Sequence, residues 1–110
     1  MKFKEYLNEN MINNNFIDEL TTFIESWINN PFCLEKKFDD EGYPIEYRIF
    51  DPRSLKELKF QIDGIIKIGK KNKYKIEKTL FDPYLTLKFT GIKKYYPESS
   101  EFTVKIEASL

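Results

Sequence analysis

The chain has 110 residues, a formal net charge of zero, 41% hydrophobic and 16% aromatic residues, no histidine and a single cysteine, Cys33. Without imidazole, a serine–histidine–aspartate triad and a cysteine–histidine pair cannot form, and zinc sites of clustered cysteine and histidine are excluded as well. One cysteine makes no intramolecular disulfide, and no run of about 18 apolar residues is present to span a membrane. We therefore expect one non-enzymatic, cytoplasmic domain without metal or cofactor.

The first thirty residues are expected to be helical. A short helix over residues 1–11 would place four apolar side chains on one face: Phe3, Tyr6, Leu7 and Met11. A second helix is predicted where apolar residues recur every three or four positions: Phe16, Ile17, Leu20, Phe23, Ile24, Trp27 and Ile28. Pro31 ends this pattern, because a residue that precedes proline is disfavoured in a helix.

Residues 31–42 are expected to form a connector, in which Cys33 lies between apolar neighbours and is interpreted as a core residue. After it the apolar residues alternate with polar ones, which is typical of half-buried strands. Strands are predicted around residues 43–50, 60–68, 74–80, 84–90 and 102–107. Gly64 marks a bulge or a close backbone approach within the second, and residues 69–73 form a hairpin loop after it.

Short loops between consecutive strands favour antiparallel pairing of neighbours, and alternation implies one buried face that a helix must cover. The predicted fold is therefore α+β: one or two N-terminal helices packed on a four- to five-stranded antiparallel meander sheet. The helical part covers about residues 1–30, the connector 31–42 and the sheet about 43–110 of a single domain.

Charge is distributed unevenly along the chain. Residues 1–51 carry eleven acids and five bases, and residues 52–110 carry seven acids and thirteen bases, so the halves have charges of −6 and +6. Either the two halves pack together and neutralise each other, or a basic face meets an acidic partner or a phosphate backbone.

The first functional hypothesis is a small protein that binds another protein, as an inhibitor, an immunity or antidefence factor, or an adaptor, by steric and electrostatic blockade. The expected contact residues are acids and tyrosines of the first half: Asp39, Asp40, Glu41, Glu46, Tyr43 and Tyr47. The acids lack the alternating spacing of a calcium loop, so we interpret them as a solvated turn and not as a metal site. Abundant residues with A/T-rich codons favour a bacterial or phage source.

The alternative hypothesis is a nucleic-acid-binding module. Lysines neutralise phosphates and aromatic rings stack on bases, and both residue types are interleaved in the second half. The candidate residues are Lys70, Lys71, Lys73, Tyr74, Lys93 and Lys94. Lysines on an exposed hairpin also merely keep a protein soluble. A third hypothesis is a pocket enclosed by the sheet, with a carboxylate of shifted pKa inside it.

Overall fold

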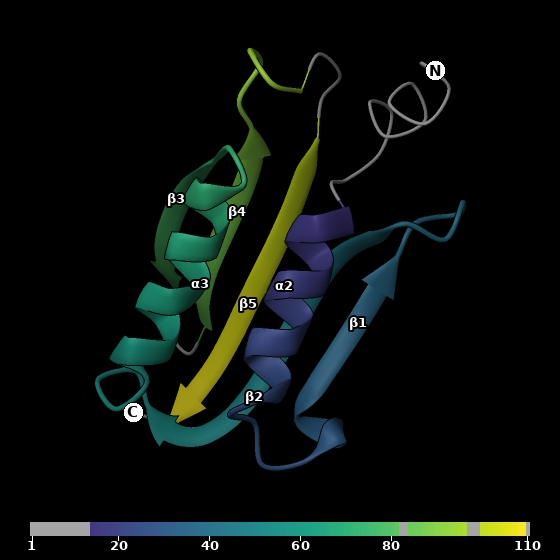
Figure 1. Cartoon of the computed structure of the whole chain (residues 1–110). Coiled ribbons are helices and arrows are strands. Elements are labelled where there is room, and N and C mark those ends of the chain that lie inside the picture. Colours follow the sequence, from purple (N-terminus) through teal and green to yellow (C-terminus); the bar gives the residue numbers. More distant parts are fainter. Residues whose placement is uncertain (1–13, 82–83, 97–99, 110) are drawn as a thin grey trace.

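The computed structural model describes residues 14–81, 84–96 and 100–109, so the helix predicted over residues 1–11 lies outside the described residues. The elements are α2 (Asn14–Glu25), the short 3-10 helix η1 (Pro31–Cys33), β1 (Leu34–Phe38), β2 (Pro44–Ser54), α3 (Lys59–Lys71), β3 (Tyr74–Phe81), β4 (Tyr84–Gly91) and β5 (Glu101–Ser109). Both helices lie on the same face of the sheet (Figure 1). No helix of the described part is long and apolar enough to cross a membrane.

The five strands form one sheet in the order β1-β2-β5-β4-β3. This confirms the α+β class, with an N-terminal helix on a mostly antiparallel sheet. The predicted antiparallel meander is present only within the β1–β2 hairpin and within the run β3–β4–β5. These two parts are joined by β2 and β5, which pair in parallel. Between these parts α3 carries the chain from β2 to the far edge of the sheet, and β5 then returns beside β2 (Figure 1).

The strand predicted over residues 60–68 and the hairpin loop predicted over 69–73 are wrong, because Lys59–Lys71 is a helix. Its buried residues are spaced by three, three and one positions: Ile62, Ile65, Ile68 and Gly69. Ile62, Ile66 and Ile68 also fit a period of two that begins at Phe60, yet Phe60 is exposed and the off-period Ile65 is fully buried. The apolar residues of this segment therefore fit both a strand period and a helical period, and packing against the sheet selects the helix.

The predicted connector contains strand β1, which pairs with β2 from Leu34↔Ile49 to Phe38↔Pro44. Four of its five residues are exposed, so it carries no apolar alternation that would reveal it in the sequence. The preceding helix is shorter than predicted and ends at Glu25. The Asn30 side chain accepts a hydrogen bond from the Phe32 N–H at 2.8 Å, which opens η1.

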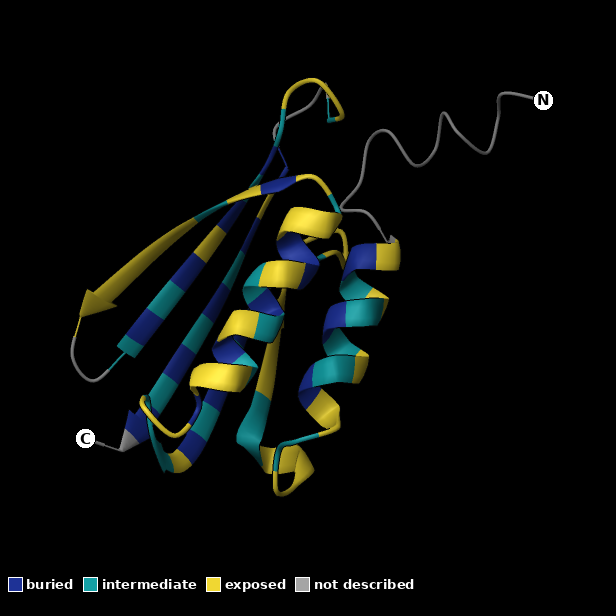
Figure 2. Ribbon diagram, turned by 60° about the vertical axis from the view of Figure 1, so that its left-hand side comes forward, coloured by how far each residue is buried: buried dark blue, intermediate teal, exposed yellow. Residues whose placement is uncertain are grey.

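The core lies between the two helices and one face of the sheet, and Figure 2 shows the buried residues alternating along the strands. Phe16 of α2 is fully buried at its centre. Its ring centroid lies 4.4 Å from that of Tyr74, 5.4 Å from that of Phe89 and 5.8 Å from that of Phe102. One helical aromatic residue therefore contacts three strands.

Candidate functional site

The acidic turn between β1 and β2 is ordered by one of its own carboxylates. Oδ1 of Asp39 accepts hydrogen bonds from the backbone N–H groups of Glu41 and Tyr43, both at 2.9 Å. Gly42 follows with φ = +90°, a conformation that glycine adopts without a steric cost. Asp39 therefore shapes the turn, while Asp40 and Glu41 remain exposed at its tip.

Glu46 lies at the centre of an ionic network on the face of the sheet that the helices leave open. Its carboxylate oxygens are 3.2 Å from Nη2 of Arg48 and 3.8 Å from the Nζ atoms of both Lys37 and Lys105. Because three cations surround it, its charge is compensated within the chain. We therefore remove Glu46 from the candidate contact residues.

Tyr47 was predicted to contact a partner, but it is buried. Its hydroxyl lies 2.8 Å from Oγ1 of Thr21, and its ring meets that of Phe102 edge-on at 5.0 Å. Tyr47 thus attaches α2 to the sheet and does not reach the surface. Tyr43, in contrast, is 37% exposed.

Two apolar residues that the sequence analysis did not select lie next to Tyr43. Phe38 is 54% exposed and Ile45 is 42% exposed. The backbone of Phe38 pairs with that of Pro44, and the Asp39 N–H donates to the Tyr43 carbonyl at 2.9 Å, so these residues lie at the same end of the hairpin. We call this region the hairpin-end surface: Phe38, Asp40, Glu41, Tyr43 and Ile45.

The exposure of these side chains could not be predicted from the sequence, for two reasons. Ile45 continues the alternation of the buried Tyr47 and Ile49, which indicates a core residue. Phe38 falls in a strand without alternation, next to a register shift between Lys37 and Phe38.

The predicted basic residues come from three segments that meet at one end of the molecule. Lys70 and Lys71 end α3, Lys73 lies in the turn before β3, and residues 93–94 lie in the loop after β4. The Ile92 N–H donates to the Lys73 carbonyl at 3.0 Å and connects the loop to the turn. Segments about twenty residues apart in the sequence are thereby brought together.

Two of the residues that were predicted to contact nucleic acid, Tyr74 and Lys71, are engaged by other residues of the chain. Tyr74 is buried, with its ring 4.4 Å from that of Phe16 and 4.9 Å from that of Tyr96, so it cannot stack on a base. The Nζ of Lys71 forms an ion pair of 2.8 Å with Glu19. The hydrogen bond from Lys71 holds the pKa of Glu19 below its usual range.

The exposed aromatic ring at this end is that of Tyr95, which is 48% exposed. The Nζ of Lys73 lies 5.3 Å from its centroid and the Nζ of Lys94 lies 5.7 Å from it, both within cation–π range. We call this region the basic-end cluster: Lys70, Lys73, Lys93, Lys94 and Tyr95. The mix of two lysines and two tyrosines at residues 93–96 was visible in the sequence, but only the fold shows that Tyr95 is exposed whereas Tyr96 is half-buried and Tyr74 buried.

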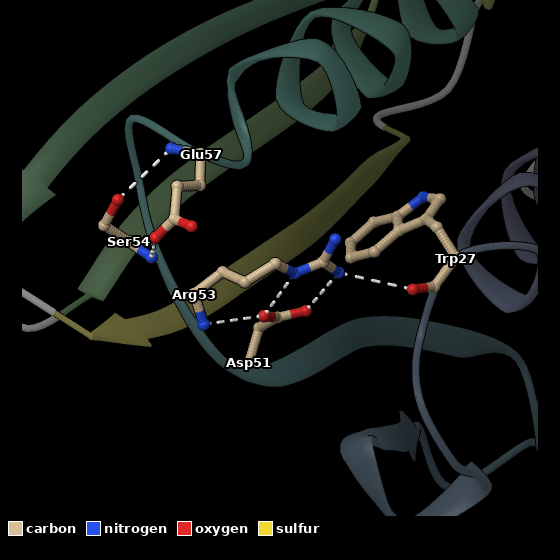
Figure 3. Close-up of polar contacts among 5 residues, drawn as sticks. All are labelled: Trp27, Asp51, Arg53, Ser54 and Glu57. Carbon is tan, nitrogen blue, oxygen red and sulfur yellow. Dashed lines mark hydrogen bonds and ion pairs between the residues drawn. The ribbon is translucent and has the colours of Figure 1, made fainter.

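The most deeply buried carboxylate outside these surfaces belongs to a structural contact at the end of β2 (Figure 3). Oδ1 of Asp51 accepts from the backbone N–H and Nε of Arg53, both at 2.9 Å, and Oδ2 accepts from Nη2 at 2.8 Å. Nη2 also donates to the Trp27 carbonyl at 3.3 Å. These hydrogen bonds from Arg53 lower the pKa of Asp51, so the carboxylate stays ionised and holds the Arg53 guanidinium, which links β2 to the turn after α2.

The hypothesis of a pocket with a carboxylate acid gains no support from Glu19, which lines the groove between the two helices. A groove of about 770 Å³ runs between α2 and α3, lined by Phe23, Gly64 and Ile68, with Glu19 at its rim. The pKa of Glu19 is lowered by its hydrogen bonds, which is the opposite of what a general acid near neutral pH requires. Cys33 is half-buried, beside Phe50 in a hollow at the sheet end, and does not belong to the core cluster, so it is not the core residue that was expected.

Among residues 14–81, 84–96 and 100–109, no three cysteine or acidic side chains gather as a metal site. No protein-family model, curated protein or solved structure matches the chain.

Proposed function

We propose that the protein is a non-enzymatic binding protein that acts on another protein through its hairpin-end surface. The observation that supports this is the exposure of three large apolar side chains, Phe38, Tyr43 and Ile45, beside two carboxylates without an ion pair in the described chain. Clustered exposed apolar residues with a polar rim are typical of protein–protein interfaces, in which tyrosine and phenylalanine are enriched.

The chemistry of this surface defines the partner. An apolar centre next to Asp40 and Glu41 fits a partner with an apolar recess bordered by lysine or arginine. The acids would accelerate the encounter, and the apolar anchors would slow dissociation. The turn is held in place by the two Asp39 hydrogen bonds, so little conformational entropy is lost on binding. The proposed role is that of an inhibitor, an immunity or antidefence factor, or an adaptor.

The first test is capture of partners from the native cell lysate, treated with nuclease, by the tagged protein. The double variant Phe38→Ser/Tyr43→Ser removes two anchors, and Phe60→Ser, an exposed phenylalanine at the start of α3, is the matched control. We expect one protein to be recovered near equal stoichiometry by the wild type and by Phe60→Ser, but not by the double variant. Equal recovery by the double variant, with all melting curves unchanged, would contradict the proposal.

The second test separates the acids from the anchors. With the captured partner immobilised, Asp40→Lys/Glu41→Lys should slow association by roughly tenfold or more at low salt and leave dissociation nearly unchanged. Asp63→Lys/Glu77→Lys, which reverses two exposed acids on α3 and β3, is the control with the same change in net charge. Unchanged association of the acidic double variant would show that the turn does not face the partner.

A further inference from the structure

The basic-end cluster concentrates positive charge that no carboxylate of the described residues neutralises. Lys71 is paired with Glu19, whereas Lys70, Lys73, Lys93 and Lys94 form no ion pair with any carboxylate of the described residues. On the open sheet face Lys37, Lys88 and Lys105 each pair with a glutamate, whereas Lys75 pairs with none in the described part of the chain. What distinguishes the cluster is that four lysines without an ion pair among the described residues gather near one exposed aromatic ring.

The aromatic ring within the cluster indicates which anion it fits. Two ammonium groups lie over the Tyr95 ring, at 5.3 and 5.7 Å from its centroid, and almost half of the residue's surface is open to solvent. A base that stacks on this ring takes the place of one exposed ammonium group, and the displaced lysine then remains beside it as a counter-charge for a neighbouring phosphate. Bases inside a duplex are not free to stack in this way, so the geometry favours a single strand.

We infer that the basic-end cluster is a second binding site, separate from the hairpin-end surface, and that it binds single-stranded nucleic acid. One exposed ring and four lysines make a short site that contacts the phosphate backbone of the strand and binds it whatever its base sequence. Tyr95 takes the stacking role that the sequence analysis gave to Tyr74. The site is independent of the proposed protein contact, so either can fail without the other.

Lys73 allows binding to be separated from stability. Its φ of 71° is in the left-handed region, at the residue after the C-cap of α3, where glycine is the usual choice. A lysine at this place is less stable than a glycine, and residues that break a local rule are often functional ones. Lys73→Gly should therefore maintain or raise the melting temperature while it weakens binding of the strand.

The experiment uses fluorescence anisotropy of a labelled oligothymidylate of about twelve nucleotides. The wild type should bind it, and the affinity should fall steeply between about 50 and 200 mM salt. Tyr95→Leu should lose roughly tenfold in affinity through lost stacking. Lys93→Gln/Lys94→Gln should lower the slope of log affinity against log salt by about 1.4, two phosphate contacts at about 0.7 each.

The control removes the same number of charges elsewhere. Lys36→Gln/Lys37→Gln changes an adjacent pair on β1, where both lysines have glutamate partners, and should leave the affinity and the salt slope unchanged. Phe38→Ser/Tyr43→Ser should also bind the oligonucleotide normally, which keeps this site apart from the hairpin-end surface.

Three results would overturn the inference. The first is an absence of binding at about 50 mM salt. The second is an equal loss of affinity in both lysine pairs. The third is that polyglutamate displaces the labelled oligonucleotide as effectively as unlabelled oligonucleotide does, and that Tyr95→Leu leaves the affinity unchanged. The cluster would then be a site for an acidic protein.

Discussion

Gly69 lies where α3 comes closest to the sheet, and replacing it with alanine tests that approach. A Cβ atom on Gly69 would overlap the ring of Phe89, with Cδ2 at 2.7 Å, and would lie 2.8 Å from Cδ1 of Ile76. Phe89 is fully buried, with its ring 5.4 Å from that of Phe16 and 6.3 Å from that of Phe102. Since these neighbours surround the ring, it has no room to move aside, and we expect Gly69→Ala to overpack the core.

Two opposing effects set the magnitude. Alanine is preferred to glycine in a helix by about 1 kcal/mol, whereas overpacking a core costs about 1–3 kcal/mol. Gly69→Ala should therefore lower the free energy of unfolding by about 1 kcal/mol net. Gly64→Ala is the matched control in the same helix, since its Cβ meets only the end of the Phe23 ring, which is half-buried beside the groove and can rotate away. Its stability should stay within about 0.5 kcal/mol of the wild type.

Urea denaturation followed by circular dichroism measures both variants. We expect a lower midpoint for Gly69→Ala with an unchanged denaturant slope, and little change for Gly64→Ala. A midpoint of Gly69→Ala at or above that of the wild type would show that the helix does not approach Phe89 so closely. The reasoning on α3 would then be wrong.

Two further predictions concern single polar contacts. Asp51→Asn should lower the free energy of unfolding at neutral pH by about 1–3 kcal/mol, less than for a fully buried ion pair because Arg53 is one-third exposed. Because the pKa of Asp51 is lowered in the folded state, its contribution is complete above about pH 4 and is lost as the pH falls through the folded pKa. The melting temperatures of the wild type and the variant should therefore converge as the pH is lowered. A difference in melting temperature that stays constant with pH would refute this. Tyr96→Phe, which removes a 2.6 Å hydrogen bond from the hydroxyl to the Asn72 carbonyl, should cost about 1 kcal/mol in the same melts, and an unchanged melting temperature would count against that bond.

Much of the fold followed from local periodicity. The helical spacing from Phe16 onward predicted α2, and the alternation around Leu87 and Val104 predicted β4 and β5. The α+β class followed because an alternating sheet needs an apolar cover. The functional surfaces were predicted less well: of the selected tyrosines, Tyr47 and Tyr74 are buried and only Tyr43 is exposed.

The sequence by itself therefore determined which chemistries the chain lacks, which segments are amphipathic, and that acids predominate in the first half and bases in the second. Only the tertiary structure decided that Lys59–Lys71 is a helix, that β5 lies parallel to β2, and that Tyr95 and not Tyr74 is the exposed ring among the lysines. The physical reason is that periodicity reports the face of an element, which is a local property. Strand order, burial and the meeting of distant charges depend on contacts between segments far apart in the chain, and these have no local signal.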